Sequence, residues 1–169
     1  MNRLFPALAA AALLGAGPVL AAEPTPWAQP GETPIDPYEV APGNAGAAPI
    51  ADPGLFEAFG GQAGVDRIID DLVDRSVVDP RLEAIFKPTD LVRLRRTLKE
   101  QVCFILGGPC AYTGRDMAAA HKDLGVTTAE FNALVENLQL AMDEAGVAFR
   151  HQNRLLARLA PMKRDVVER

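Results

Sequence analysis

Apolar residues recur three and four positions apart in four long stretches of the chain. These stretches are residues 65–76, 90–106, 127–146 and 149–167, and charged residues fill many of the positions between the apolar ones. Apolar residues at this spacing lie on one face of an α-helix, and burying that face stabilises the helix. We therefore expect four long helices that pack against each other through their apolar faces.

Proline, glycine and capping residues mark where these helices begin and end. Pro80 follows the first helix, because a proline inside a helix removes a hydrogen bond and clashes with the preceding turn. Gly107-Gly108-Pro109 stops the second helix. Thr127, followed three positions later by Glu130, has the spacing of a capping box. No stretch alternates apolar and polar residues as a strand does, so the sequence predicts an all-α fold.

Residues 116–125, between the second and third long helices, form a short helix-forming run that presents one histidine. Alanines occupy the three positions before His121, so little bulk lies on that face. Gly125 is expected to cap the C-terminal end of this short helix. A neutral imidazole is the commonest metal ligand among side chains. A half-buried polar histidine on a packed helix fits the same residues, and the run alone leaves both interpretations open.

The N-terminal part of the chain lacks the helical pattern. Arg3, a short apolar run and the small-residue site Val19-Leu20-Ala21 match a secretory signal peptide over residues 1–22. Residues 23–54 are rich in proline, alanine and glycine, which indicates a disordered spacer. We therefore expect a folded domain over residues 55–169, exported to the periplasm, with no membrane span after signal cleavage.

The composition narrows the classes of partner. The formal net charge is −5, and no stretch of the chain carries a basic stripe. Proteins that bind nucleic acid carry clustered Lys and Arg that neutralise phosphates. Nucleic acid is therefore not an expected partner.

Short motifs follow one another along the domain. They are Leu55-Phe56-Glu57-Ala58-Phe59-Gly60-Gly61, Asp79-Pro80-Arg81-Leu82 followed by Phe86, Leu106-Gly107-Gly108-Pro109, Tyr112-Thr113-Gly114-Arg115-Asp116-Met117, Ala120-His121, Leu124-Gly125-Val126-Thr127 and Leu159-Ala160-Pro161-Met162. In this order they resemble the group I truncated haemoglobins, which fold two helices over two in a shortened globin arrangement, and the resemblance covers residues 55 to about 167. It implies an all-α truncated two-over-two globin fold, with haem b as cofactor.

The resemblance also implies roles for individual residues. His121 matches the proximal histidine and is the expected iron ligand. Phe86 matches the phenylalanine that wedges against the haem face, and Met117 and Phe131 would pack the proximal side. Arg93 matches a basic residue that can reach a propionate, although an ordinary solvated arginine fits equally well. The expected haem-binding residues are Leu72, Val73, Phe86, Thr89, Arg93, Leu94, Thr97, Leu98, Gln101, Val102, Met117, His121 and Phe131.

The distal side departs from the family pattern. Val73 stands where members often carry a tyrosine, and Leu94 and Leu98 stand where others offer glutamine. Gln101 is the only obvious hydrogen-bond donor among the distal side chains. It either reaches a bound ligand or closes the edge of the pocket by bonding to the backbone. A positioned donor stabilises bound oxygen by about 1–3 kcal/mol. We therefore expect weaker oxygen binding than in relatives with the tyrosine.

Cys103 and Cys110 are the only cysteines. No Cys-x-x-Cys-His run is present, so the sequence does not support covalent haem attachment through that motif. In an oxidising compartment the two cysteines can form a disulfide between the distal helix and the loop before His121. Two buried thiols that pack as small apolar groups are the alternative.

The expected function is an exported b-type haem protein that binds O2, CO or NO at an open iron site. A ligand-binding protein is favoured over a dedicated enzyme. Peroxide chemistry requires a distal acid–base group, and none is visible in the sequence. Turnover of nitric oxide requires stably bound oxygen and a reductase, and the apolar distal side argues against it. One alternative is a six-coordinate electron-transfer protein with His151, Lys99 or a methionine as sixth ligand. The other is a helical interaction module without cofactor.

Overall fold

The computed structural model describes residues 29–33 and 39–169. The expected signal peptide, residues 1–22, lies outside this described part. The described chain consists of helices and loops without a strand, which confirms the predicted all-α class. None of its helices combines the length and the apolar character that a membrane crossing requires.

Three of the long helices match the predicted stretches, and the fourth begins where predicted but ends earlier. They are α2 (Gly61–Val78), α4 (Leu91–Ile105), α6 (Thr128–Glu144) and α7 (Phe149–Leu159). The short elements are η1 (Pro42–Ala45), α1 (Leu55–Ala58), α3 (Glu83–Phe86), α5 (Met117–His121), η2 (Ala160–Met162) and α8 (Lys163–Val166).

The last predicted helix is interrupted. A single helix over 149–167 was expected, but α7 ends at Leu159, and a 3₁₀ turn and the short α8 follow it. Pro161 stands at the start of that turn and lacks the N–H that would continue the α-helical hydrogen bonds. The prediction of one continuous helix is therefore wrong.

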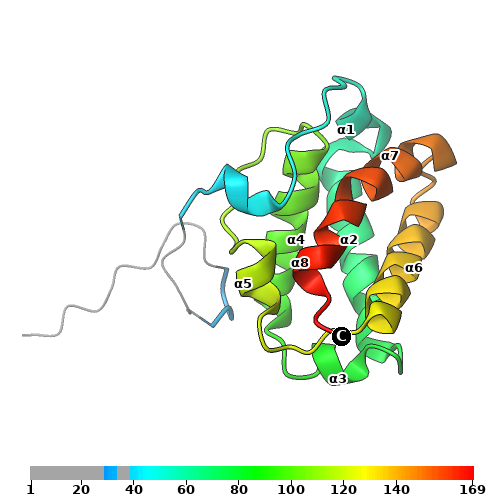
Figure 1. The fold of residues 1–169 in the computed structure, drawn as a ribbon. Coiled ribbons are helices and arrows are strands. Elements are labelled where there is room, and N and C mark those ends of the chain that lie inside the picture. Colours follow the sequence, from blue (N-terminus) through cyan, green and yellow to red (C-terminus); the bar gives the residue numbers. More distant parts are fainter. Residues whose placement is uncertain (1–28, 34–38) are drawn as a thin grey trace, which may run out of the picture.

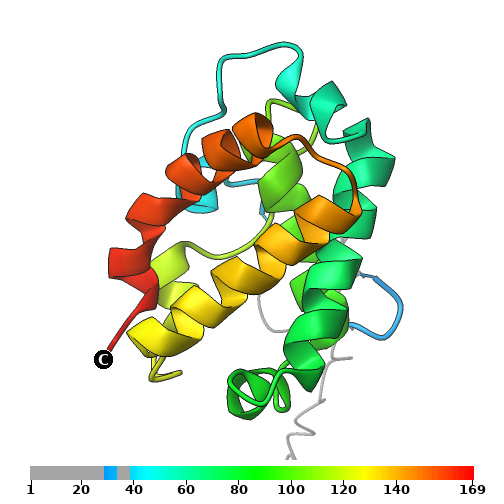
Figure 2. The same ribbon diagram turned by 90° about the vertical axis from the view of Figure 1, so that its right-hand side faces the viewer.

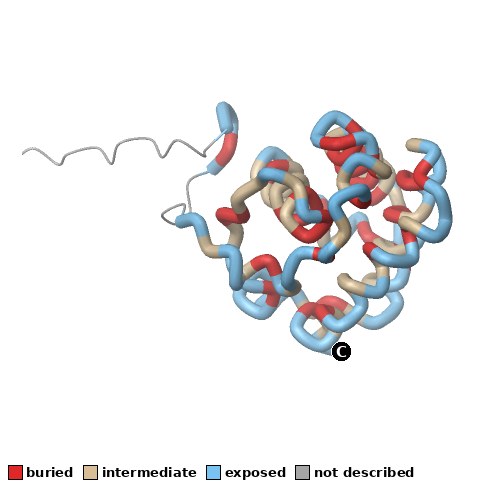
Figure 3. The backbone as a smooth tube through the Cα atoms, turned by 90° about the horizontal axis from the view of Figure 1, so that it is seen from above, coloured by how far each residue is buried: buried red, intermediate tan, exposed pale blue. Residues whose placement is uncertain are grey.

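Helix α2 lies at the centre of the domain and packs against both α4 and α6 (Figures 1 and 2). Its apolar face is fully buried, with Val65, Ile69 and Val73 at 0% exposure. Each such side chain stabilises the fold by about 1.5–3 kcal/mol relative to leaving it exposed. Buried and exposed stretches alternate along the described chain, as amphipathic helices require (Figure 3).

Side-chain caps begin the helices that flank the central one. Asp90 accepts hydrogen bonds from the N–H groups of Val92 and Arg93 at the start of α4, both at 3.1 Å. Thr127 and Glu130 form the predicted capping box at the start of α6. These caps satisfy backbone donors that have no partner within the helix.

The expected disorder before the domain is wrong for residues 39–54. Ala45 is 0% and Ile50 7% exposed, so both belong to the core. The N–H of Ile50 donates to the carbonyl oxygen of Ile105 at 2.8 Å, and the carbonyl oxygen of Ala45 accepts from Nε2 of Gln101 at 2.9 Å. Proline and alanine show no amphipathic period, but small apolar residues and backbone groups still pack where a neighbouring helix offers partners.

Residues 29–33 hold a second anchor. The Glu32 side chain is completely buried, and its carboxylate accepts two hydrogen bonds from Arg96 of α4, at 2.9 and 2.8 Å. Arg96 also donates to Glu100 at 2.7 Å and to Thr113 at 2.5 Å. Burial opposes the charge of Arg96, but the hydrogen bonds to Glu32 and Glu100 outweigh burial and raise its pKa. This segment is therefore fixed to α4 by a buried ion pair.

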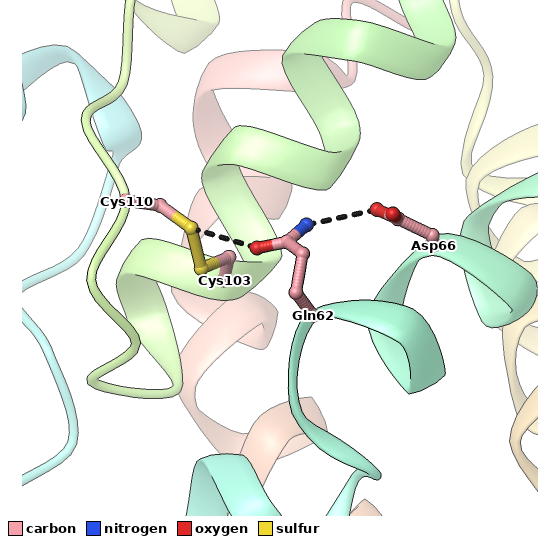
Figure 4. The surroundings of a disulfide bond; sticks show 4 residues. All are labelled: Gln62, Asp66, Cys103 and Cys110. Atoms are coloured by element: carbon pink, nitrogen blue, oxygen red, sulfur yellow. Dashed lines mark hydrogen bonds between the residues drawn. A yellow bond between two sulfur atoms is a disulfide. The ribbon is translucent and has the colours of Figure 1, made fainter.

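The cysteines form the predicted disulfide. Cys103 near the end of α4 is bonded to Cys110 in the following loop, with 5.9 Å between the Cα atoms. Figure 4 shows Gln62 of α2 beside it, with its Oε1 3.0 Å from Sγ of Cys110 and its Nε2 donating to Asp66 at 2.8 Å. The bond ties α4 to the loop that leads to α5.

Replacing both Cys103 and Cys110 with alanine is expected to lower the free energy of unfolding by about 2–3 kcal/mol, because the unfolded chain regains the entropy of an open loop. Urea unfolding of the oxidised wild type and of the double variant measures the difference. The reduced wild type serves as control and should lose a similar amount. Equal unfolding midpoints for all three samples would show that the disulfide does not stabilise the fold.

Candidate cofactor site

A cavity of about 320 Å³ lies among α2, α3, α4, α5 and α6. This volume is within the range of small-molecule sites, which are concave and mostly apolar. Aliphatic and aromatic side chains supply most of the wall. The lining residues are Leu72, Val73, Leu82, Ile85, Phe86, Thr89, Leu94, Thr97, Leu98, Gln101, Tyr112, Met117, Ala120, His121, Leu124, Val126, Glu130, Phe131, Leu134 and Val166.

The structure brings together all of the predicted haem-binding residues except two. Val102 lies in the core, at 4% exposure, and does not line the cavity. Arg93 does not line it either; its Nε lies 3.9 Å from a carboxylate oxygen of Glu32. The role of Arg93 at a propionate therefore stays a prediction.

His121 ends α5 with its ring half-buried at the cavity wall. Its Nδ1 lies 2.7 Å from the carbonyl oxygen of Met117, one turn earlier in the helix. A carbonyl can only accept, so Nδ1 carries the hydrogen of the neutral ring, and the lone pair remains on Nε2. An imidazole oriented by its other nitrogen in this way is ready to ligate a metal.

The short helix α5 is fixed at its start by Asp116, whose Oδ1 accepts from the N–H of Ala119 at 2.9 Å. The prediction that Gly125 caps its end is wrong, because the helix stops at His121 and Lys122, with φ −56° and ψ 132°, has already left the helical conformation. Asp123 and Gly125 both have positive φ, at 63° and 64°. Gly125 therefore shapes the following loop, which turns twice before α6.

The hydroxyl and amide donors of the cavity wall are already used. Thr89 donates to the carbonyl of Ile85 at 2.9 Å, and Thr97 to that of Arg93 at 3.0 Å. Nε2 of Gln101 donates to Ala45 and lies 3.4 Å from Sδ of Met117. Of the two possibilities for Gln101, the structure has the one that closes the pocket edge through a backbone bond.

Tyr112 is a pocket residue that the sequence did not single out. Its hydroxyl donates to the carbonyl of Arg115 at 2.9 Å. Burial, helped by the negative charges of Glu100 and Asp116, raises the pKa of Tyr112 to about 12. The phenol therefore stays protonated at neutral pH, and its proton is directed to the backbone.

Other missed wall residues fall into two groups. Five of them are neighbours, along the chain or on the same helix, of residues that were predicted, so helical spacing could have found them: Leu82, Ile85, Ala120, Glu130 and Leu134. Leu124, Val126 and Val166 come from a loop and from the end of the sequence, and no local pattern marks them.

A methionine, His151 and Lys99 were suggested as a sixth iron ligand, and of these only a methionine, Met117, lines the cavity, one turn before His121 on the same helix. His151 and Lys99 are not lining residues. Nζ of Lys99 is paired with Asp70 at 2.9 Å, and Nε2 of His151 accepts from Arg150 at 3.0 Å. Neither observation favours a six-coordinate site.

Comparison with known proteins gives a consistent family. A family model described as bacterial-like globin matches residues 54–168. The group 1 truncated hemoglobin GlbN of Nostoc commune is 30% identical over 115 residues, which are 68% of this chain and 98% of that protein. The group 1 truncated hemoglobin of Tetrahymena thermophila is 32% identical over 96 residues, which are 57% of this chain and 79% of that protein.

Solved structures of truncated haemoglobins share the fold. The truncated hemoglobin of Tetrahymena pyriformis, in its Fe(III) form, has a TM-score of 0.65 and 25% identity, over 68% of this chain and 98% of that one. The 2/2 hemoglobin of Synechococcus, in the cyanomet state and with covalently attached heme, has a TM-score of 0.63 and 30% identity, with the same shares covered.

The chain therefore belongs to the bacterial-like globins and, among them, to the truncated haemoglobins of group 1. This family binds haem and small gaseous ligands. The residues of the cavity fit such a group, because an apolar slot is bordered by one imidazole whose Nε2 is not used by the bond to Met117.

Proposed function

We propose that this protein is an exported b-type haem protein that binds small diatomic gases at an open coordination position and holds oxygen weakly. The observation that carries the proposal is His121, held by the Met117 carbonyl at the wall of an apolar cavity. A haem iron ligated there would supply the gas-binding chemistry. The chain itself orients the imidazole, excludes water and shapes the distal wall.

The state of the two cysteines supports the b-type proposal. Both cysteines of the chain are consumed by the disulfide, so neither is free to form a thioether to a haem vinyl group. The Synechococcus relative, which carries covalently attached heme, makes a direct test necessary. Acid–acetone extraction of the holoprotein should remove all of the haem; haem that stays with the protein would contradict the b-type proposal.

The distal wall supports weak oxygen binding. The side chains of Val73, Leu94 and Leu98 have no hydrogen-bond donor. Those of Thr97 and Gln101 donate to other groups of the protein. A bound ligand that gathers negative charge is stabilised by donors aimed at it. Carbon monoxide and nitric oxide depend less on such a donor than oxygen does. We therefore infer that the protein prefers these gases to oxygen. Weakly held oxygen also favours oxidation of the iron, and an unidentified reductase would then return the iron to the ferrous state.

The export proposal rests on the N-terminal sequence and is consistent with the disulfide, since disulfides persist in oxidising compartments. The test is to express the full chain in a bacterium, separate the periplasmic from the cytoplasmic fraction and sequence the N-terminus. A mature protein that begins near residue 22 or 23 in the periplasmic fraction supports export. An intact N-terminus in the cytoplasm would refute it.

An absorption spectrum of the reduced protein, with and without carbon monoxide, tests the function. A Soret band that shifts on adding the gas establishes haem with an open sixth position. A low-spin reduced spectrum that takes up the gas slowly would instead support electron transfer. The absence of a Soret band after haemin is added would leave the helical interaction module.

Replacing Val73 with tyrosine is expected to slow oxygen dissociation by about 5- to 150-fold, the equivalent of about 1–3 kcal/mol from one added donor. Val73 is fully buried at the cavity wall, so the new hydroxyl enters the distal side. Stopped-flow displacement of oxygen by carbon monoxide measures the rate.

Val73→Phe is the matched control, because it adds the same ring without the hydroxyl. It should leave oxygen dissociation near the wild-type rate, and neither variant should slow carbon monoxide dissociation comparably. Equal oxygen rates in the tyrosine and phenylalanine variants would show that a donor at this position does not reach the ligand.

A further inference from the structure

The last residues of the sequence fold back onto the loop that follows His121. Figures 1 and 2 show the C-terminal segment beside the start of α6 and close to α5. Val166 lines the cavity, the N–H of Glu168 donates to the carbonyl of Val126 at 2.9 Å, and the N–H of Thr128 donates to the carbonyl of Arg169 at 3.2 Å. The end of the chain is therefore part of the cavity wall.

The Glu168 carboxylate binds two backbone groups of that loop. Its Oε1 accepts from the N–H of Asp123 at 2.8 Å, and its Oε2 accepts from the N–H of Gly125 at 2.6 Å. Hydrogen bonds to an ionised acceptor are among the stronger ones in proteins. Backbone N–H groups that converge in a turn form an anion-binding concavity, and here a side chain of the same chain fills it.

The bonded residues have a conformation that needs support. Asp123 has a φ of 63°, in the left-handed region that residues with a Cβ seldom adopt. Gly125 has a φ of 64°, and its carbonyl accepts from Nε and Nη2 of Arg169 at 3.1 and 2.7 Å. A Cβ at Gly125 would lie 2.6 Å from that Nη2, but this atom is the end of a long side chain that can shift, so it is the positive φ that favours glycine here.

The loop matters because α5 cannot hold His121 by itself. A helix as short as Met117–His121 is not stable in isolation, so its position depends on what holds its two ends. Asp116 caps the beginning. The end is held by the loop, and Glu168 is the side chain that bonds the loop on both sides of Leu124, a cavity-wall residue.

We propose that Glu168 is a positioning residue for the proximal histidine: by holding the N–H groups of Asp123 and Gly125, its carboxylate fixes the loop after His121 and thereby the orientation of the imidazole toward the haem. The inference rests on the proposed haem-binding function. It assigns to the end of the sequence, 47 positions after the histidine (168 − 121), a part in the cofactor site.

The test compares Glu168→Ala with Glu168→Gln and with Asp165→Ala. Glutamine keeps one carbonyl acceptor and loses the charge, so its effect should be intermediate. Asp165 is an exposed acid on α8 whose ion pair is with its neighbour Arg164, which makes it the matched control for loss of a negative charge. Thermal unfolding of each variant establishes that the helical domain is intact.

Two readouts separate positioning from stability. Hydrogen exchange of the apoprotein over residues 122–127 should become about 10-fold faster in Glu168→Ala. In the holoprotein, the rate of haem transfer to an acceptor apoprotein should rise about 10-fold, as for other residues that orient a metal ligand, and the iron–histidine stretching band should shift or broaden. Asp165→Ala should change none of these.

Faster exchange in Glu168→Ala with an unchanged iron–histidine band and unchanged haem transfer would overturn the proposal. It would show that Glu168 stabilises the loop without orienting His121. Unchanged exchange would overturn it as well. If the wild type itself takes up no haem, the proposed function fails, and the positioning role fails with it. Because wild-type haem uptake is measured first, failure of the function is distinguished from failure of the inference.

Discussion

Replacing His121 with alanine is expected to abolish the Soret band of the protein after incubation with haemin and gel filtration. The cavity wall has one imidazole, and the other polar side chains that surround it are engaged with the backbone. Alanine is the best helix former, so the substitution removes the nitrogen ligand without weakening α5 through its propensity. Absorption at the Soret wavelength, relative to protein concentration, measures the loss.

His151→Ala is the control, because it removes the other histidine of the chain, which lies outside the cavity wall. It should retain the full Soret band. A His121→Gly variant supplied with free imidazole should recover the band in part, since the small ligand can occupy the vacated volume. A full, wild-type band in His121→Ala would contradict proximal ligation by this residue.

Replacing Arg96 with leucine is expected to lower the free energy of unfolding by about 3–5 kcal/mol, the usual cost of removing one partner of a buried ion pair. The Glu32 carboxylate has a completely buried side chain and would lose the two hydrogen bonds from Arg96. Glu100 and Thr113 would lose their bonds to the same guanidinium. Urea unfolding followed by circular dichroism measures the loss.

Arg95→Leu is the matched control on the same helix. Arg95 pairs with Asp70 and Asp74 at the surface, where an ion pair contributes up to about 1 kcal/mol. The double variant Glu32→Leu, Arg96→Leu should recover part of the stability lost in Arg96→Leu, because the completely buried Glu32 carboxylate, which Arg96→Leu leaves without its main partner, is then removed as well. A loss in Arg96→Leu no larger than in Arg95→Leu would show that residues 29–33 do not pack on α4 in solution.

Features that depend on neighbours in the sequence could be predicted. The apolar spacing of α2 and α4 is local, and the Thr127–Glu130 capping box uses residues three positions apart. The disulfide joins two cysteines on either side of one turn. The predicted residues of the cavity wall came from the resemblance to the truncated haemoglobins, and some further wall residues lie one turn from them on the same helix and share their face.

Features that depend on partners far away in the sequence could not be predicted. In the sequence, Glu32 is an ordinary acidic residue in a proline-rich stretch. Its burial is explained only by its partner Arg96, 64 positions later. Gln101 looked like a candidate ligand donor until its acceptor, the carbonyl of Ala45, was known. Val166 and Glu168 reach the cofactor site through the return of the chain, which no local spacing records.

The segment before the globin part also changes what counts as the folding unit. The family model begins at residue 54, yet Ala45 and Ile50 are buried in the core: the carbonyl of Ala45 accepts from the Gln101 side chain of α4, and the N–H of Ile50 donates to the backbone carbonyl of Ile105. A chain that started at residue 54 would have a cavity in its core where Ala45 packs, and the side-chain amide of Gln101 would point into that cavity without its acceptor. The segment thus fills part of the core, and its removal is expected to destabilise the globin domain.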